Sequence, residues 1–168
     1  MKIRNTNGFT LIELLIVVAI IGIIAAIAVP GLLRARMSGN EASAIGSMRA
    51  INTAQVNYSQ RCQGYAITLP ELKAAGDFLS PDLTSAPAVV KSGYTVTLAA
   101  GEGNTAMPAP PAGCTTPGSN YYASAVRLTL GSTGTRSFAT NAQGTIFYSN
   151  TATAPLEPTF TTTATPIQ

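Results

Sequence analysis

The sequence of 168 residues contains no histidine, no tryptophan and only two cysteines. Without histidine the chain cannot build a Ser-His-Asp triad, a histidine zinc site or a haem held by histidine. Two cysteines are too few for a cluster held by four thiolates. Because no paired-carboxylate motif and no nucleophile motif takes their place, we expect no enzyme activity, no metal and no cofactor.

Charged residues are also scarce, at 10% of the chain. Ten Lys and Arg face seven Asp and Glu, and two of the basic residues, Lys2 and Arg4, lie within the first eight positions. Phosphate binding needs clustered basic residues, so this thin excess predicts no specific nucleic-acid site. The low charge suits a protein that is partly embedded in a membrane and tightly assembled.

What the chain does have is a long apolar run, residues 9–29, in which Glu13 is the single charged residue. A helix of these 21 residues is about 32 Å long, close to the roughly 30 Å hydrocarbon core of a bilayer. A buried core helix in so small a domain would need a polar face, which the run lacks. We therefore expect a transmembrane helix. A lone acid inside it is costly and calls for a partner.

The charges around the run predict its orientation. Lys2 and Arg4 precede it, and the next basic residues are Arg34 and Arg36. The positive-inside rule then places the N-terminus in the cytoplasm. No A-x-A-like cleavage site follows Val29, so we expect the apolar run to be retained after processing.

The opening residues K-I-R-N-T-N-G-F-T-L-I-E, positions 2–13, resemble the class III leader of type IV pilins and the related pseudopilins. They combine a short basic leader, a glycine, then Phe, Thr and Leu, and an acid five places after the junction. The resemblance implies that a prepilin peptidase cuts between Gly8 and Phe9 and discards the leader, residues 1–8. It also implies that the amine of Phe9 is then N-methylated.

Two partners for Glu13 remain open. Within the chain, the dipole at the N-terminus of its own helix and the new amine would favour the acid by about 0.3–1 kcal/mol. Between chains, the cationic amine of Phe9 on a neighbouring subunit would neutralise it and set the register, as buried polar pairs do. The family resemblance favours the second pairing.

The helix is expected to continue beyond the apolar run, over residues 9–63 in all, with a kink near Pro30 and some flexibility from Gly22. The continuation has one apolar face, interrupted by Gln55, and should pack on a small domain. The members of this face are Ala44, Met48, Ile51, Tyr58 and Cys62.

Three charges that follow the apolar run have two open interpretations. Arg34, Arg36 and Glu41 could make contacts between subunits or could simply be solvated, and solvation is the commoner outcome for such charges.

The rest of the chain predicts an α+β fold, in which the long helix packs on an antiparallel sheet of three or four strands. The head is expected over residues 64–150 and a flexible Thr/Pro-rich tail over 151–168. One short helix is predicted at 69–76. The predicted strands are 93–99, 121–130, 136–140 and 145–149, with turns at 131–134 and 141–144.

Cys62 and Cys114 would lie on the extracytoplasmic side of the membrane, where disulfides persist. A bond between them would close a 53-residue loop and stabilise the head by about 4 kcal/mol in the chain-entropy model. Many pilins place their disulfide nearer the C-terminus, so this position departs from the family's habit.

The resemblance implies a structural subunit of a type IV pilus, stored in the inner membrane and polymerised into an extracellular filament. Filaments of this family serve adhesion, twitching motility and DNA uptake. The implied partners are further copies of the chain, the prepilin peptidase and methylase, and the assembly platform with its ATPase.

A minor pilin and a type II secretion pseudopilin remain as alternatives. Major pseudopilins carry a C-terminal calcium loop rich in Asp. Here the last Asp is Asp82, and the only acid after Glu102 is Glu157, which argues against a major pseudopilin but leaves a minor pilin open.

Overall fold

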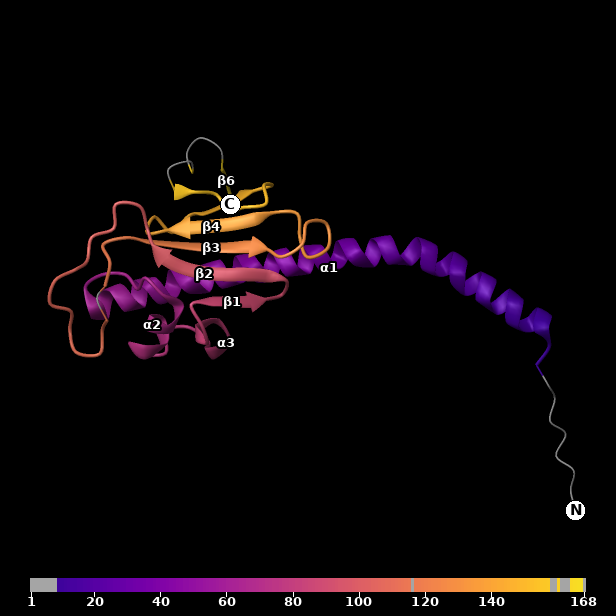
Figure 1. Cartoon of the computed structure of the whole chain (residues 1–168), viewed down its shortest axis with the longest axis horizontal. Coiled ribbons are helices and arrows are strands. Elements are labelled where there is room, and N and C mark those ends of the chain that lie inside the picture. Colours follow the sequence, from indigo (N-terminus) through magenta and orange to yellow (C-terminus); the bar gives the residue numbers. More distant parts are fainter. Residues whose placement is uncertain (1–8, 116, 158–159, 161–163, 168) are drawn as a thin grey trace, which may run out of the picture. The chain divides into compact units, whose positions relative to one another are not determined.

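The computed structural model describes residues 9–115, 117–157, 160 and 164–167. The chain divides into two compact units, Met1–Arg36 and Met37–Gln168, and each is described by itself. Their elements are labelled in Figure 1. The expected leader, residues 1–8, lies outside the described residues.

The helix α1 runs from Leu11 to Cys62, and Pro30 lies inside it. The helix therefore does not end at Pro30, although proline removes one backbone hydrogen bond there. In the first unit its side chains are exposed throughout. Among the described helices α1 alone is long and apolar enough to cross a membrane, a judgement by length and composition.

The head, which is the second unit, contains one antiparallel sheet in the order β1-β2-β3-β4-β5-β6. The predicted α+β class is confirmed, but the prediction of three or four strands is wrong. The strands are β1 Ala88–Lys91, β2 Tyr94–Ala100, β3 Tyr121–Arg127, β4 Ser137–Asn141, β5 Ile146–Ser149 and β6 Thr165–Pro166.

The first missed strand, β1, forms a tight hairpin with β2. Lys91 pairs with Tyr94, and the two residues between them, Ser92 and Gly93, have φ of 49° and 73°. Positive φ at both central residues matches the twist of the flanking strands. The Ser-Gly pair that follows two valines and a lysine is a hairpin signal, but the sequence analysis predicted no strand before residue 93.

Two short helices connect α1 to the sheet. The predicted helix at 69–76 is found as α2, Leu69–Ala74, and its Glu71 accepts hydrogen bonds from the backbone N–H groups of Ile67 and Thr68 at its N-terminus. The second helix, α3 at Pro81–Thr84, was not predicted.

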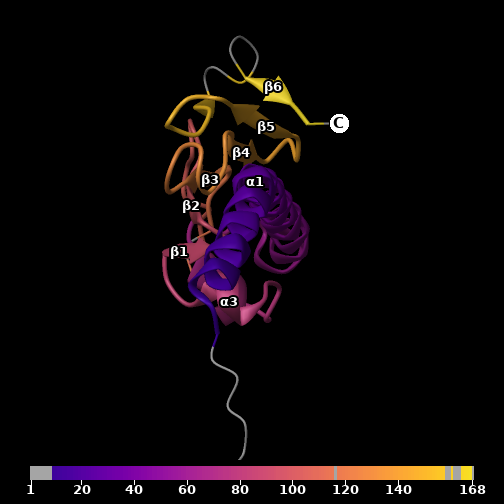
Figure 2. The ribbon, with the colours of Figure 1, turned by 90° about the vertical axis from the view of Figure 1, so that its right-hand side faces the viewer.

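The core of the head lies between α1 and one face of the sheet, as Figure 2 shows. Every member of the predicted apolar face of α1 is buried there. These residues are Ala44, Met48, Ile51, Tyr58 and Cys62. Gln55 is buried among them because its side-chain amide donates to the carbonyl of Ala66 at 2.8 Å and accepts from the N–H of Ala66 at 2.9 Å.

The opposite face of the sheet is covered in part by the C-terminal tail. Phe160 is buried and stacks on Phe147 with 4.6 Å between the ring centroids, and Tyr122 donates its hydroxyl to the carbonyl of Pro155 at 2.7 Å. Three residues of the tail, Ala154, Pro155 and Phe160, are buried, and Ala154 and Phe160 pack with side chains of the sheet. The flexibility expected of the tail stays a prediction.

Candidate functional site

The N-terminus of α1 contains a capping box formed by Thr10 and Glu13. Glu13 Oε2 accepts hydrogen bonds from the backbone N–H of Thr10 at 3.0 Å and from its hydroxyl at 2.5 Å. The backbone N–H of Glu13 donates to the Thr10 hydroxyl at 3.3 Å. This arrangement satisfies donors that a helix start otherwise leaves without partners.

The sequence reading missed this contact, although Thr10-Leu-Ile-Glu13 has the Thr-x-x-Glu spacing of a capping box. Glu13 lies in the first turn of α1, where the dipole of its own helix favours an acid, and Thr10 is an additional partner that neither alternative named. Both side-chain bonds end on Oε2 of the carboxylate.

Phe9 precedes the helix and is 76% exposed. Gly8, on the other side of the expected cleavage junction, lies outside the described residues. Since α1 begins only at Leu11, the described side of the junction is not helical. Outside a helix, the backbone N–H and C=O groups are not tied up in helical hydrogen bonds and can contact a peptidase.

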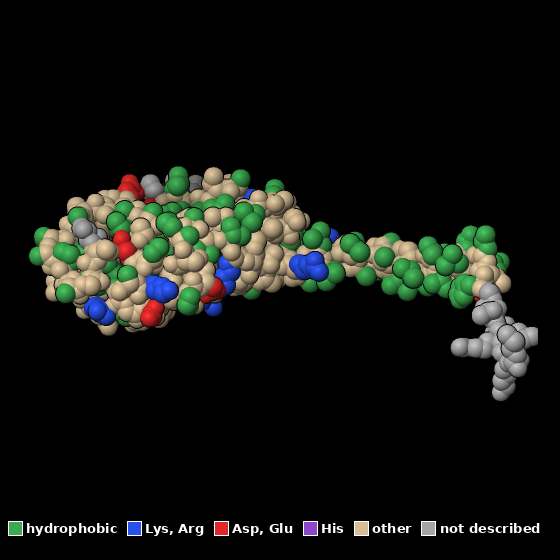
Figure 3. Space-filling view, turned by 60° about the horizontal axis from the view of Figure 1, so that its bottom comes forward, with side chains coloured by type: hydrophobic (Ala, Val, Ile, Leu, Met, Phe, Trp, Pro, Cys, Tyr) green, Lys and Arg blue, Asp and Glu red, His purple; other side chains and the backbone are tan. Residues whose placement is uncertain are grey.

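The apolar segment that follows has no partner within the described residues. From Leu11 to Leu33 its large hydrophobic side chains are 42–80% exposed. Figure 3 shows hydrophobic side chains along the visible side of this segment. Burial of one such side chain is worth about 1.5–3 kcal/mol, so the exposed set is a strong driving force for contact with lipid or with other apolar helices.

Of the three charges whose role was open, Glu41 is buried in the head. Its carboxylate forms an ion pair with Arg136 at 2.7 Å and accepts from the Thr135 backbone N–H and hydroxyl, each at 2.7 Å. Burial alone would raise the pKa of Glu41, but the hydrogen bonds from Thr135 and Arg136 outweigh it and lower the pKa below its ordinary value.

Glu41 is therefore neither solvated nor free for contacts between subunits, and both interpretations are wrong for it. The sequence did not predict the ion pair because Arg136 lies 95 residues away from Glu41. Arg34 and Arg36 are exposed, and neither forms an ion pair with a described residue.

At the other end of α1, Cys62 and Cys114 form a disulfide with their Cα atoms 5.7 Å apart. The bond fastens the end of the helix to the loop between β2 and β3. Beside it, Tyr65 and Gly118 exchange two backbone hydrogen bonds of 2.8 Å.

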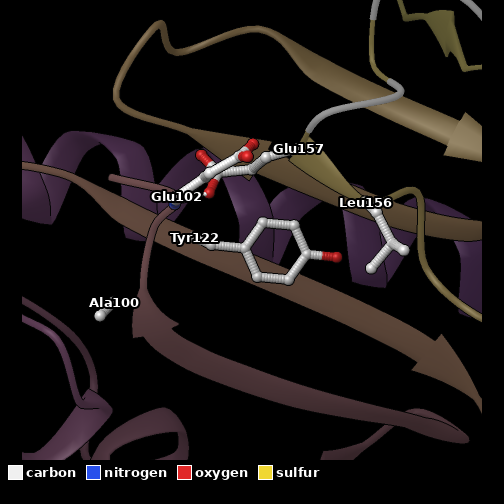
Figure 4. A pocket seen from close by; sticks show the side chains of 5 residues that line it. All are labelled: Ala100, Glu102, Tyr122, Leu156 and Glu157. Atoms are coloured by element: carbon white, nitrogen blue, oxygen red, sulfur yellow. Dashed lines mark hydrogen bonds between the residues drawn. The ribbon is translucent and has the colours of Figure 1, made fainter. Parts of the chain in front are cut away.

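A shallow groove elsewhere on the head is shown in Figure 4, lined by Ala100, Glu102, Tyr122, Leu156 and Glu157. The Glu157 carboxylate accepts hydrogen bonds from the backbone N–H of Glu102 and from the Asn120 side chain. These bonds fasten the tail to the β2–β3 loop. The described residues contain no group of three or more His, Cys, Asp or Glu that could hold a metal ion.

Comparison with known proteins identifies the N-terminal region. Residues 3–29 match the family model of the prokaryotic N-terminal methylation motif. The chain is 37% identical over 99 residues to the type IV major pilin protein PilA of Myxococcus xanthus, a match that covers 59% of this chain and 40% of that protein.

It is also 63% identical over 38 residues to the type IV wide pilus major component PilA4 of Thermus thermophilus, covering 23% of this chain and 29% of that protein. The matches thus span less than half the length of either relative. No solved structure is significantly similar to the chain. The matches confirm the resemblance to type IV pilins that the leader and the apolar run predict.

Proposed function

We propose that this chain, whose N-terminal region is that of a type IV pilin, is a structural subunit of a type IV pilus. In this proposal it is stored in the inner membrane with its N-terminus in the cytoplasm and is then polymerised into an extracellular filament. It acts by assembly with further copies of itself and not as an enzyme.

The observation that carries the proposal is a contrast in burial between the head, which has its own apolar core, and the exposed apolar segment of α1. The head buries its own apolar residues, whereas the segment from Leu11 to Leu33 leaves its large apolar side chains exposed. A bilayer covers such a segment during storage, and the same segments of neighbouring subunits cover it in a filament. One helix thereby serves both states.

Processing comes before assembly. A prepilin peptidase cuts between Gly8 and Phe9, and methylation of the new Phe9 amine follows. The start of α1 at Leu11 supports cleavage at this junction, because it leaves Phe9 outside the helix.

Glu13 then acts in assembly by pairing with the Phe9 amine of a neighbouring subunit. The capping box does not prevent this pairing, since its side-chain bonds use only Oε2. In the bilayer, Thr10 supplies the hydrogen bonds that make the acid tolerable near the membrane edge. In the filament, the added cation neutralises it, and the match of acid to amine fixes the register.

The remaining assignments follow from the same proposal. The partners are the peptidase and methylase, the assembly platform and its ATPase. Both relatives are named as major components of pili, which favours a major pilin over a minor pilin or a pseudopilin.

The test is mass spectrometry of fibres sheared from cells that carry the gene, with electron microscopy of cells that lack it. We expect long surface fibres that disappear on deletion. Their subunit should begin at Phe9 and carry one added methyl group. The matched control Gly8→Val, which crowds the cleavage junction, should retain the leader and give no fibres. Unchanged fibres on deletion, or fibres whose subunit keeps residues 1–8, would contradict the proposal.

A further inference from the structure

The two sulfurs of the disulfide in the head differ in their exposure to solvent. Cys62 is the last residue of α1 and is fully buried in the core, at 0% exposure. Cys114 packs against the same core but is only half-buried, and it lies on the long connection from β2 to β3 (Figure 1). An external molecule can therefore approach the bond from the side of Cys114, whereas the core shields Cys62.

The two cysteines also differ in how firmly they are held. Cys62 sits at the end of a packed helix, and Tyr58, one turn before it, is likewise at 0% exposure. The described residues 108–115 are joined to the rest of the head by the disulfide and by a hydrogen bond of 3.4 Å from the Tyr58 hydroxyl to the carbonyl of Thr115. When the disulfide is open, Cys114 is therefore the cysteine that can move.

The surroundings of Cys114 suit thiol–disulfide exchange. Its neighbours Gly113 and Thr115 are both exposed, so the chain on either side of Cys114 is open to a partner. Nη2 of Arg61 comes within 3.6 Å of the position where a Cβ on Gly113 would lie, and Arg61 forms no ion pair with a described residue. The thiolate is the nucleophile in such an exchange, and a nearby guanidinium stabilises it.

We propose that Sγ of Cys114 is the site at which the head reacts with an external disulfide, and that Cys62 is the resolving cysteine that completes the bond. The partner is defined by its chemistry, a disulfide that two thiols can reduce, carried by a thiol–disulfide oxidoreductase or by a small molecule. The inference concerns the head alone and does not require the proposed assembly into a pilus.

The reaction takes two exchange steps. The thiolate of Cys114 first attacks the partner's disulfide, which forms a mixed disulfide and frees one thiolate of the partner. The loop then brings Cys114 back to the end of α1. The thiol of Cys62 loses its proton to water as its sulfur attacks Sγ of Cys114, which breaks the mixed disulfide and frees the partner's second thiolate. Two electrons thus pass from the two cysteines to the partner, and a dithiol partner opens the bond by the reverse steps.

The opposite order of attack is disfavoured by the packing of the helix end. If Cys62 reacted first, an external disulfide would have to reach a sulfur with 0% exposure. That access requires the end of α1 to open away from the core, which costs more free energy than movement of a loop with few fastenings. The difference in burial therefore assigns the first step to Cys114 and the second to Cys62.

The test compares two single-cysteine variants of the full chain in detergent at neutral pH. Cys62→Ala keeps Cys114, and the matched variant Cys114→Ala keeps Cys62. Each variant is incubated with oxidised glutathione and, in a second arm, with an oxidised protein disulfide isomerase. Mass spectrometry of the intact chain follows formation of the mixed disulfide. The same reactions in urea give the rates for the unfolded chain.

We expect Cys114 to react at least about tenfold faster than Cys62 in the folded chain, and the two rates to converge in urea, where neither sulfur is shielded. A protein disulfide that reacts as readily as glutathione identifies an oxidoreductase as the partner, and reaction with glutathione alone identifies a small disulfide. Equal rates in the folded chain, or a faster reaction at Cys62, would overturn the proposal.

A second measurement on the wild-type chain does not depend on the folding of either variant. The reduced chain is exposed to oxidised glutathione, quenched with acid at early times and digested with trypsin. Cleavage after Arg61, Lys73, Lys91 and Arg127 places the two cysteines in separate peptides, residues 62–73 and 92–127. We expect the transient glutathione adduct on 92–127. An adduct found mainly on 62–73 would show that Cys62 reacts first and that the proposed order is wrong.

Discussion

The two parts of α1 have opposite surroundings although they belong to one helix. From Leu11 to Leu33 the large side chains are exposed, whereas from Ala44 to Cys62 one face is buried in the head. Composition explains the difference. The first part is apolar all round, so no single packing face can cover it. The second part places polar residues such as Arg49 and Thr53 outward and closes its apolar face against the sheet.

The two parts of α1 should therefore be stabilised by different contacts. The head contains its own core, a half-buried ion pair and a disulfide, so it should be stable by itself. The first part leaves its large apolar side chains exposed. Its free energy therefore depends on lipid or on other copies of the chain.

The largest expected effect comes from truncating one isoleucine in each part. Ile51→Ala removes a fully buried side chain and should lower the free energy of unfolding of the head by about 2–5 kcal/mol. Ile20→Ala changes a side chain that is 52% exposed and should alter that free energy by less than about 0.5 kcal/mol. Urea unfolding in detergent, followed by tyrosine fluorescence, measures both. Equal losses would mean that the first part also supports the head.

A smaller effect is expected from the ion pair that fastens α1 to the sheet. Glu41→Gln should lower the stability of the head at neutral pH by about 1–3 kcal/mol, since it removes charged hydrogen bonds to Thr135 and Arg136. The arginine keeps its contacts with the rings of Phe138 and Tyr148.

In the same variant, the free energy of unfolding of the head should depend less on pH under acidic conditions. Because the pKa of Glu41 is lower in the folded head, its contribution is present above the unfolded pKa of about 4.3 and is lost as the pH falls through the folded pKa. Wild type should therefore lose this increment below about pH 4.3, and Glu41→Gln should not. Asp77→Asn, at an exposed acid, is the matched control. If the stability of Glu41→Gln falls as steeply as that of wild type below about pH 4.3, other carboxylates are responsible for the loss.

Much of the fold could be predicted from local patterns. The apolar run, the buried face of α1 and strands β2 to β5 each have a period or a length that the sequence displays directly. The sequence did not predict β1, because its four residues Ala-Val-Val-Lys follow a proline and are too few to show a clear period. The buried position of Phe160 was not predicted, because a single aromatic residue in a Thr/Pro-rich segment shows no periodic pattern.

The candidate site was harder to predict, and the reason is the range of the contacts. Glu41 and Gln55 are polar residues made tolerable by partners that only the folded head supplies. Thr10 and Glu13 are different, because their spacing alone predicts the capping box. The charge of Glu13 suggests a cation as its partner, whereas the hydrogen bonds to Glu13 come from Thr10.

The most direct test of the central claim is fibre assembly by the Glu13→Gln variant. Glutamine also closes a capping box, so this change keeps the helix start and removes only the charge. Thr10→Val is the complement, because it removes the cap and keeps the charge. The account predicts that Glu13→Gln is cleaved and retained in the membrane, yet forms at most a tenth of the wild-type number of fibres by electron microscopy. Wild-type fibres from Glu13→Gln would contradict the claim that a neighbour's Phe9 amine is the partner of Glu13.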